Sequence, residues 1–245
     1  MFGWHLACSL CALSVVLGGL YLGWYRWPGW YLANALRIAP ILCAVDVALG
    51  PLLTLLIANP AKPRRALARD ISIIAAVQFG ALVYGASTLW NGRPLYYAFS
   101  EDRLQLVQAS DLRAELSTPQ PLVAAPLAPH WYSLPRWIWA PLPSDPSEAL
   151  RIAQSATLGG ADVVQLPRYF RPWELGLAEL RAQLRGIDEW PYFSRMEKER
   201  LHARLAARRI PSGRNTLVLW GGTRRVLVVF DPQTLRVAGV LRADS

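Results

Sequence analysis

The chain has 245 residues, 53% of them hydrophobic, and a formal net charge of +9 at pH 7. The apolar residues gather in the first 90 positions, which indicates a membrane-embedded part followed by a polar domain. All three cysteines lie in the apolar part, so the polar remainder folds without disulfide bonds. The basic charge comes with no nucleic-acid-binding motif, which argues against a nucleic-acid partner.

Three apolar stretches are predicted to be transmembrane helices: Trp4–Leu22, Ile38–Ala58 and Ile71–Leu89. Each is long enough to cross a hydrocarbon core of roughly 30 Å at about 1.5 Å per residue. Backbone polar groups in lipid must be bonded internally, which favours helices. We therefore expect a three-helix transmembrane region over residues 1–90 and an outward domain over residues 91–245.

The short loops predict the orientation of these spans. The loop between the second and third spans is strongly basic, which is typical of a cytoplasmic loop, with Lys62, Arg64, Arg65 and Arg69. The loop of residues 23–37 is instead aromatic, which is typical of a membrane interface: Trp24, Tyr25, Trp27, Trp30 and Tyr31. The N-terminus is then cytoplasmic, and the C-terminal domain faces outward. In a bacterial cell that side is the periplasm.

The outward domain is predicted to be α+β with an antiparallel sheet. Residues 93–108 are typical of a β-hairpin, and the eight prolines of residues 117–146 argue against a long helix or a central strand. Helices are predicted to begin at Pro146, Pro172 and Pro191. Turn residues separate three short strands at the end of the chain: Thr216–Trp220, Arg225–Phe230 and Arg236–Leu241.

One acid lies inside a predicted span. Asp46 is about eight residues into the second span, and a carboxylate there is costly unless it is paired, neutralised or hydrated. Gly50-Pro51 follows one turn later and should kink the helix. Asp46 lies at a depth between Gln78 and Tyr84 of the third span. Three interpretations follow: a hydrogen bond that locks the helices, recognition of another membrane protein, or ion transport.

No arrangement of nucleophile, base and acid is recognisable, and no cofactor or metal site is expected. The sequence Cys8-Ser9-Leu10-Cys11 has the C-x-x-C spacing of redox and metal motifs. It lies within a predicted span and lacks a second cysteine pair. The default interpretation is therefore that both cysteines are small apolar residues.

Several segments together resemble the type IV pilin accessory proteins of the TfpX/TfpZ type, also described as fimbrial assembly proteins. They are Asp46-Val47 with Gly50-Pro51, Lys62, Arg69-Asp70-Ile71, Gln78 to Gly85 including Tyr84, Arg93-Pro94 and Glu101-Asp102-Arg103. The ordered match covers roughly residues 46–111. The resemblance implies a bacterial inner-membrane protein that assists a cognate pilin, and it brings no catalytic residues.

We therefore expect a non-enzymatic accessory factor for pilus assembly or dynamics. Its partners would be the major pilin, other inner-membrane proteins of the pilus machinery, and lipid. The residues expected to bind the partner are Asp46, Gly50, Pro51, Gln78, Tyr84 and Arg93. The alternatives are a membrane enzyme, either a thiol oxidoreductase using Cys8 and Cys11 or a pilin-modifying transferase, and a ligand sensor.

Overall fold

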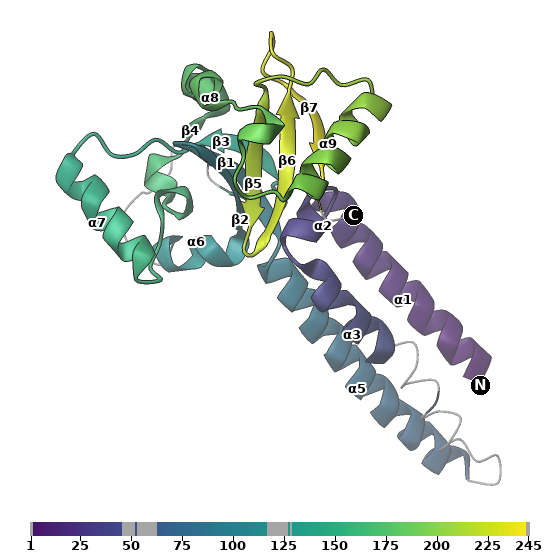
Figure 1. Cartoon of the computed structure of the whole chain (residues 1–245). Helices are drawn as coiled ribbons and strands as arrows, with labels where there is room; N and C mark the ends of the chain where they lie inside the picture. The colour runs from purple at the N-terminus through teal and green to yellow at the C-terminus, as the bar shows by residue number, and fades with distance from the viewer. Residues whose placement is uncertain (1, 46–51, 53–62, 117–126, 128, 244–245) are drawn as a thin grey trace. The chain divides into compact units, whose positions relative to one another are not determined.

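The computed structural model describes the chain except for residues 1, 46–51, 53–62, 117–126, 128 and 244–245. It divides into two compact units, residues 1–93 and 94–245 (Figure 1). The predicted partner-binding residues Asp46, Gly50 and Pro51 lie outside the described residues.

The first unit is helical. Its elements are α1 (Phe2–Gly23), α2 (Gly29–Leu32), the 3₁₀ helix η1 (Ala35–Arg37), α3 (Ala39–Cys43) and α5 (Arg64–Asn91). Among the described residues, two helices are long and apolar enough to cross a membrane, over Leu6–Gly23 and Arg65–Asn91. They contain the first and third predicted spans. Of the second predicted span, α3 and its immediate neighbours are described, and most of the rest lies outside the described residues.

The two long helices differ from the core helices of a soluble domain. Only 6% of the apolar window in α1 and 11% of that in α5 is buried inside the protein. Their outward side chains include Val15, Leu22, Ile73, Val77 and Phe79, each at least half exposed. Apolar side chains turned outward on two helices of this length suit a lipid environment better than water.

The second unit is built on one curved sheet of seven strands. Its N-terminal half contains β1 (Pro94–Ser100), β2 (Arg103–Gln108), α6 (Ala109–Leu116), β3 (Arg136–Trp139), α7 (Pro146–Thr157), η4 (Val163–Gln165), η5 (Pro167–Tyr169) and β4 (Arg171–Pro172). Its C-terminal half contains η6 (Trp173–Gly176), α8 (Leu177–Gln183), η7 (Ile187–Glu189), α9 (Arg195–Ala207), β5 (Thr216–Gly221), β6 (Arg224–Phe230) and β7 (Val237–Leu241).

The strand order is β4-β3-β1-β2-β5-β6-β7. The predicted hairpin is confirmed as the antiparallel pair β1–β2, and the predicted C-terminal meander as β5–β6–β7. The prediction of an antiparallel sheet is wrong, because β1 pairs with β3 and β2 pairs with β5 in parallel. The sheet is mixed because segments distant in sequence insert beside the hairpin on both sides.

The predicted exclusion of a central strand from the proline-rich region is also wrong. Strand β3 lies between β1 and β4 in the sheet. Its four residues, Arg136–Trp139, fall between Pro135 and Pro141, so every residue of the strand can donate a backbone hydrogen bond. The prolines therefore limit the length of this strand without preventing its pairing.

The sheet curves into a half-barrel and packs on both faces. Trp137 of β3 and Phe230 of β6 have ring centroids 6.5 Å apart although three strands separate β3 from β6 in the sheet order. Figure 1 shows α6 and α7 on the flank that carries β1 to β3. A buried cluster joins these helices to the sheet and the following turns: Tyr96, Ala98, Val107, Leu112, Ile138, Ile152, Val163, Val164 and Phe170.

Two predicted helices in this unit begin or divide differently from the expectation. The helix expected from Pro172 is a 3₁₀ turn, η6, followed by α8. The helix expected from Pro191 begins at Arg195, because Ser194 caps it: its hydroxyl accepts the Glu197 N–H, and the Glu197 carboxylate accepts the Ser194 N–H at 2.7 Å. The helix from Pro146 is confirmed as α7, and the Asp145 carboxylate accepts the Ser147 N–H at its start.

Candidate functional site

One face of α5 carries its packed side chains. Ile74, Gln78, Gly85 and Leu89 are the buried positions of this helix among its described side chains. Their spacings of four and seven residues place them on one stripe of an α-helix. Gln78 is the polar member of this otherwise apolar stripe, so its amide lies on the buried side of α5 rather than at the outer surface.

The stripe approaches α3 closely at Gly85. A Cβ atom added to Gly85 would lie 2.5 Å from Cδ1 of Leu42 and 3.2 Å from its Cδ2. Leu42 is itself buried. Gly85 therefore permits the contact between α3 and α5, as small residues do at helix interfaces. At Gly80, by contrast, an added Cβ atom would meet nothing within 4 Å among the described residues.

Tyr84 lies away from this stripe. It is 75% exposed, and its backbone carbonyl accepts hydrogen bonds from the hydroxyls of Ser87 and Thr88. Gln78 and Tyr84 were both expected to lie near Asp46. The structure places Gln78 on the packed face of α5 and Tyr84 on its outer face, so the two side chains point to different neighbours.

Arg93 folds back on the end of α5. Its guanidinium donates to the Trp90 carbonyl at 2.8 Å and lies 4.2 Å from the centroid of the Trp90 ring. The side chain is buried. Arg93 was expected to bind the partner. In the structure these contacts place it at the end of α5, where it holds Trp90.

The aromatic loop packs against the same end of α5. Tyr25 is buried and its hydroxyl donates to the Leu89 carbonyl at 2.7 Å, while Trp24 meets Trp90 edge to face at 4.9 Å. This loop was predicted to be an interfacial belt. Tyr25 instead lies inside the unit, whereas Trp27 keeps 37% of its surface exposed.

An apolar cavity of about 430 Å³ opens beside this junction. Leucine, alanine and aromatic side chains from α1, the loop that follows it, α2, η1, α3 and α5 line it: Leu17, Leu20, Tyr21, Tyr25, Trp30, Ala35, Leu36, Ala39 and Leu89. A hollow with this lining can hold an acyl chain or the side chains of an apolar helix. The sequence prediction missed the cavity, because its lining comes from five separate helical elements and the loop at Tyr25. The feature of the sequence that could have indicated a cavity was the aromatic loop of residues 23–37.

The cysteines of the first unit are free thiols. Cys8 and Cys11 are exposed on α1, and Cys43 is partly buried in α3. Among the described residues, no group of three His, Cys, Asp or Glu side chains could hold a metal ion. The thiols at positions 8 and 11 share one helix face, since they are three residues apart.

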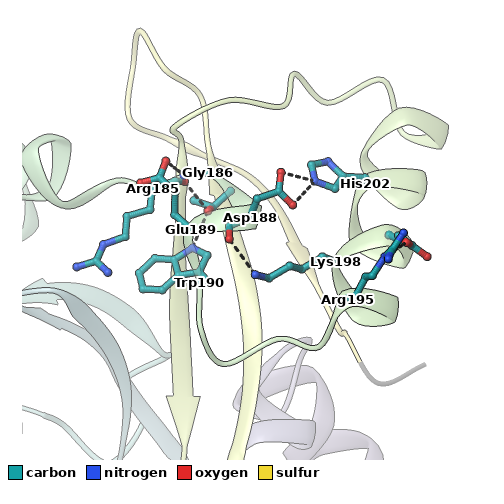
Figure 2. Close-up of polar contacts among 10 residues, drawn as sticks. Arg185, Gly186, Asp188, Glu189, Trp190, Arg195, Lys198 and His202 are labelled. Carbon is teal, nitrogen blue, oxygen red and sulfur yellow. Dashed lines mark hydrogen bonds and ion pairs between the residues drawn. The ribbon is translucent and has the colours of Figure 1, made fainter.

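A polar network in the second unit joins η7 to α9 (Figure 2). The His202 Nε2 atom lies 3.2 Å from both carboxylate oxygens of Asp188, and Lys198 donates to the Asp188 carbonyl at 2.8 Å. Within the loop, the Gly186 N–H donates to the Glu189 carboxylate at 3.0 Å. The indole of Trp190 donates to the Thr216 hydroxyl at 3.0 Å. These contacts fasten the loop to α9 and β5, an arrangement that stabilises the fold.

Comparison with known proteins shows similarity to fimbrial assembly proteins of Dichelobacter nodosus. The serogroup I protein is 28% identical over 110 residues, which are 45% of this chain and 43% of that protein. The protein of serogroups C1 and C2 is 27% identical over 110 residues, which are 84% of its length, and the serogroup E1 protein is 27% identical over 43% of its length.

The matched segment thus spans less than half of the serogroup I and serogroup E1 proteins. No family profile and no solved structure matches the chain. The similarities support a relationship to a fimbrial assembly family over 45% of this chain.

Proposed function

We propose that this protein is an inner-membrane accessory factor of the TfpX/TfpZ type, which binds its cognate type IV pilin during pilus assembly or dynamics. The similarity to fimbrial assembly proteins over 45% of the chain carries the proposal. The two long apolar helices support a membrane location, because their side chains face outward rather than into a core. The role is non-enzymatic: the protein holds a helix and performs no chemistry.

The proposed topology has three spans, with the second over residues 38–58. The basic loop with Lys62 and Arg69 stays in the cytoplasm, and the second unit lies in the periplasm. An alkaline phosphatase fused after Ser245 should therefore be active, and a β-galactosidase fused there inactive. The reverse pattern would place the second unit in the cytoplasm and refute this topology.

The proposed pilin contact lies in the membrane. Pilins of this class have an apolar N-terminal helix with a charged amino end and an embedded acid, as the resemblance implies. The cavity beside α1 and α5 offers an apolar surface for such a helix. Asp46 supplies a charge that a polar group of the pilin helix can pair with, and Gly50-Pro51 loosens the second span beside it.

Two substitutions at Asp46 test this contact. Asp46→Asn keeps the shape and a hydrogen-bonding group but removes the charge, and Asp46→Leu removes both. If a charge pair recognises the pilin, both variants insert stably and fail in piliation. If Asp46 only locks helices together, Asn is tolerated and Leu lowers the abundance of the protein.

Crosslinking in the membrane separates these outcomes. A photoreactive residue at exposed Leu36 of the cavity rim should crosslink to pilin in the wild-type background. A photoreactive residue at exposed Trp4, outside the cavity lining, is the matched control and should not. Stable Asp46 variants with normal pili and no crosslink from position 36 would refute pilin binding at this site.

The second candidate is a membrane thiol oxidoreductase, favoured by the exposed thiols of Cys8 and Cys11 on one helix face. It predicts that Cys8→Ser or Cys11→Ser abolishes function. The accessory role predicts normal piliation for both variants, so a single piliation assay distinguishes the two.

A further inference from the structure

A tight turn in the second unit presents two aromatic residues to solvent. The Ser133 N–H donates to the His130 carbonyl at 3.1 Å, and the Ser133 hydroxyl accepts the His130 N–H at 2.9 Å. Trp131 and Tyr132 occupy the two central positions of this turn, between Pro129 and Pro135. The two hydrogen bonds use only backbone atoms and Ser133, so the turn does not depend on the aromatic side chains.

The side chains at the tip are far more exposed than apolar residues usually are. Trp131 is 72% exposed, Tyr132 59% and the neighbouring Leu134 58%. The rings contact members of the same turn: Trp131 meets Tyr132 edge to face at 5.4 Å, and His130 stacks on Tyr132 at 5.4 Å. Three large apolar side chains on a constrained tip indicate a surface that is covered by something else.

The chemistry of the tip favours a bilayer surface. Tryptophan and tyrosine are the residues enriched at membrane–water interfaces, where the ring is buried and its polar edge stays hydrated. No acidic residue occurs between Glu115 and Asp145. Bacterial inner-membrane headgroups are anionic, so a segment without acids can approach them without repulsion.

The chain itself keeps the second unit close to the membrane. Helix α5 ends at Asn91 and β1 begins at Pro94, so two residues connect the proposed third span to the sheet. A connection this short holds the unit next to the headgroups once α5 crosses the bilayer.

We infer that the Trp131–Leu134 tip is an interfacial anchor that inserts into the headgroup region of the same membrane that holds the helices. This rests on the membrane location in the proposed function. The anchor limits how the second unit can turn above the bilayer, and thereby fixes the side that it presents to a pilin.

The test uses the full chain in lipid vesicles of phosphatidylcholine and phosphatidylglycerol. Cys8, Cys11 and Cys43 are replaced by serine, and Leu134→Cys carries an environment-sensitive fluorophore beside the intact Trp131 and Tyr132. Leu158→Cys is the matched control, since Leu158 is 89% exposed at the end of α7. We expect a shift to shorter wavelength and about half of the emission to be quenched by nitroxide-labelled lipid at position 134, with neither change at position 158.

Trp131→Ser with Tyr132→Ser should return the signal at position 134 to that of the control, because the turn survives but its anchor is gone. Equal signals at both positions in the intact protein would refute the anchor. A shift that arises only on addition of pilin, without lipid quenching, would also refute it. Extraction by alkaline carbonate tests the membrane location of the helices separately. If the protein resists extraction but position 134 shows neither the spectral shift nor the quenching, the proposed membrane location stands and the anchor is refuted.

Discussion

The contact between Gly85 and Leu42 allows a sharp test of how the helices of the first unit pack. A valine Cβ at position 85 would lie 2.5 Å from Cδ1 of Leu42, well inside van der Waals contact. A Cβ atom at position 80 would meet nothing within 4 Å among the described residues. Both positions are interior to α5, so the change in helix propensity is the same and cancels in the comparison.

Gly85→Val should therefore be less stable than Gly80→Val by about 1–3 kcal/mol, the usual cost of overpacking. The value should lie toward the lower end, because the Leu42 atoms that are touched are at the end of a flexible side chain. The assay is the free energy of unfolding of the full chain in detergent micelles, titrated with a denaturing detergent.

A double-mutant cycle identifies the partner. Leu42→Ala removes Cγ, Cδ1 and Cδ2, the three Leu42 atoms nearest to the added Cβ. In that background Gly85→Val should lose most of its cost, which corresponds to a coupling of roughly 0.5–3 kcal/mol. Equal stability of Gly85→Val and Gly80→Val, or additive effects of the valine and Leu42→Ala, would refute the packing of α3 on this stripe.

Three further predictions concern the second unit. Ser194→Ala should lower the free energy of unfolding by about 1 kcal/mol through loss of the α9 cap, whereas Ser194→Gly should cost only about a few tenths, and equal losses in chemical denaturation would contradict the cap. Burial raises the pKa of the Asp111 carboxyl, so its contribution to stability is present below about pH 4 and is lost as pH rises through the raised pKa. Asp111→Asn should therefore become more stable relative to the parent as pH increases from 4 to 7 in thermal unfolding, and a pH-independent difference would contradict this. Gly176→Ala should destabilise by about 1–3 kcal/mol, because its Cβ would lie 2.5 Å from Cγ of Trp139, and a neutral effect on thermal unfolding would show that the indole moves freely.

The sequence predicted the local parts of the fold and missed the long-range ones. The β1–β2 hairpin and the β5–β6–β7 meander follow from apolar runs separated by short turns, a signal contained within a few residues. The parallel pairing of β2 with β5 joins Leu104 to Leu219, and no local pattern specifies that register. The sequence of β1 did indicate a central position in the sheet. Its apolar run Leu95–Phe99 is typical of a strand that is covered on both faces, and all seven residues of β1 are buried.

Helical phase explains why depth alone did not identify the neighbours of Asp46. Gln78 and Tyr84 were paired with it because both lie near its expected depth. Six residues at about 100° each place them roughly 120° apart around α5, and the structure shows one on the packed stripe and the other on the outer face. The stripe becomes visible in the sequence only when Gly85, Leu89 and Ile74 are taken with Gln78 as one helical face.

The packed stripe leads to a specific prediction for the proposed site. Gln78 lies on the packed stripe of α5, whereas Tyr84 is 75% exposed on its outer face. We therefore expect Gln78 rather than Tyr84 to be the residue of α5 that acts together with Asp46. Gln78→Leu should impair Asp46-dependent piliation, whereas Tyr84→Phe should be tolerated. In a double-mutant cycle for protein stability, Asp46→Asn should couple to Gln78→Leu and be additive with Tyr84→Phe. Coupling to Tyr84 alone would refute the choice of Gln78.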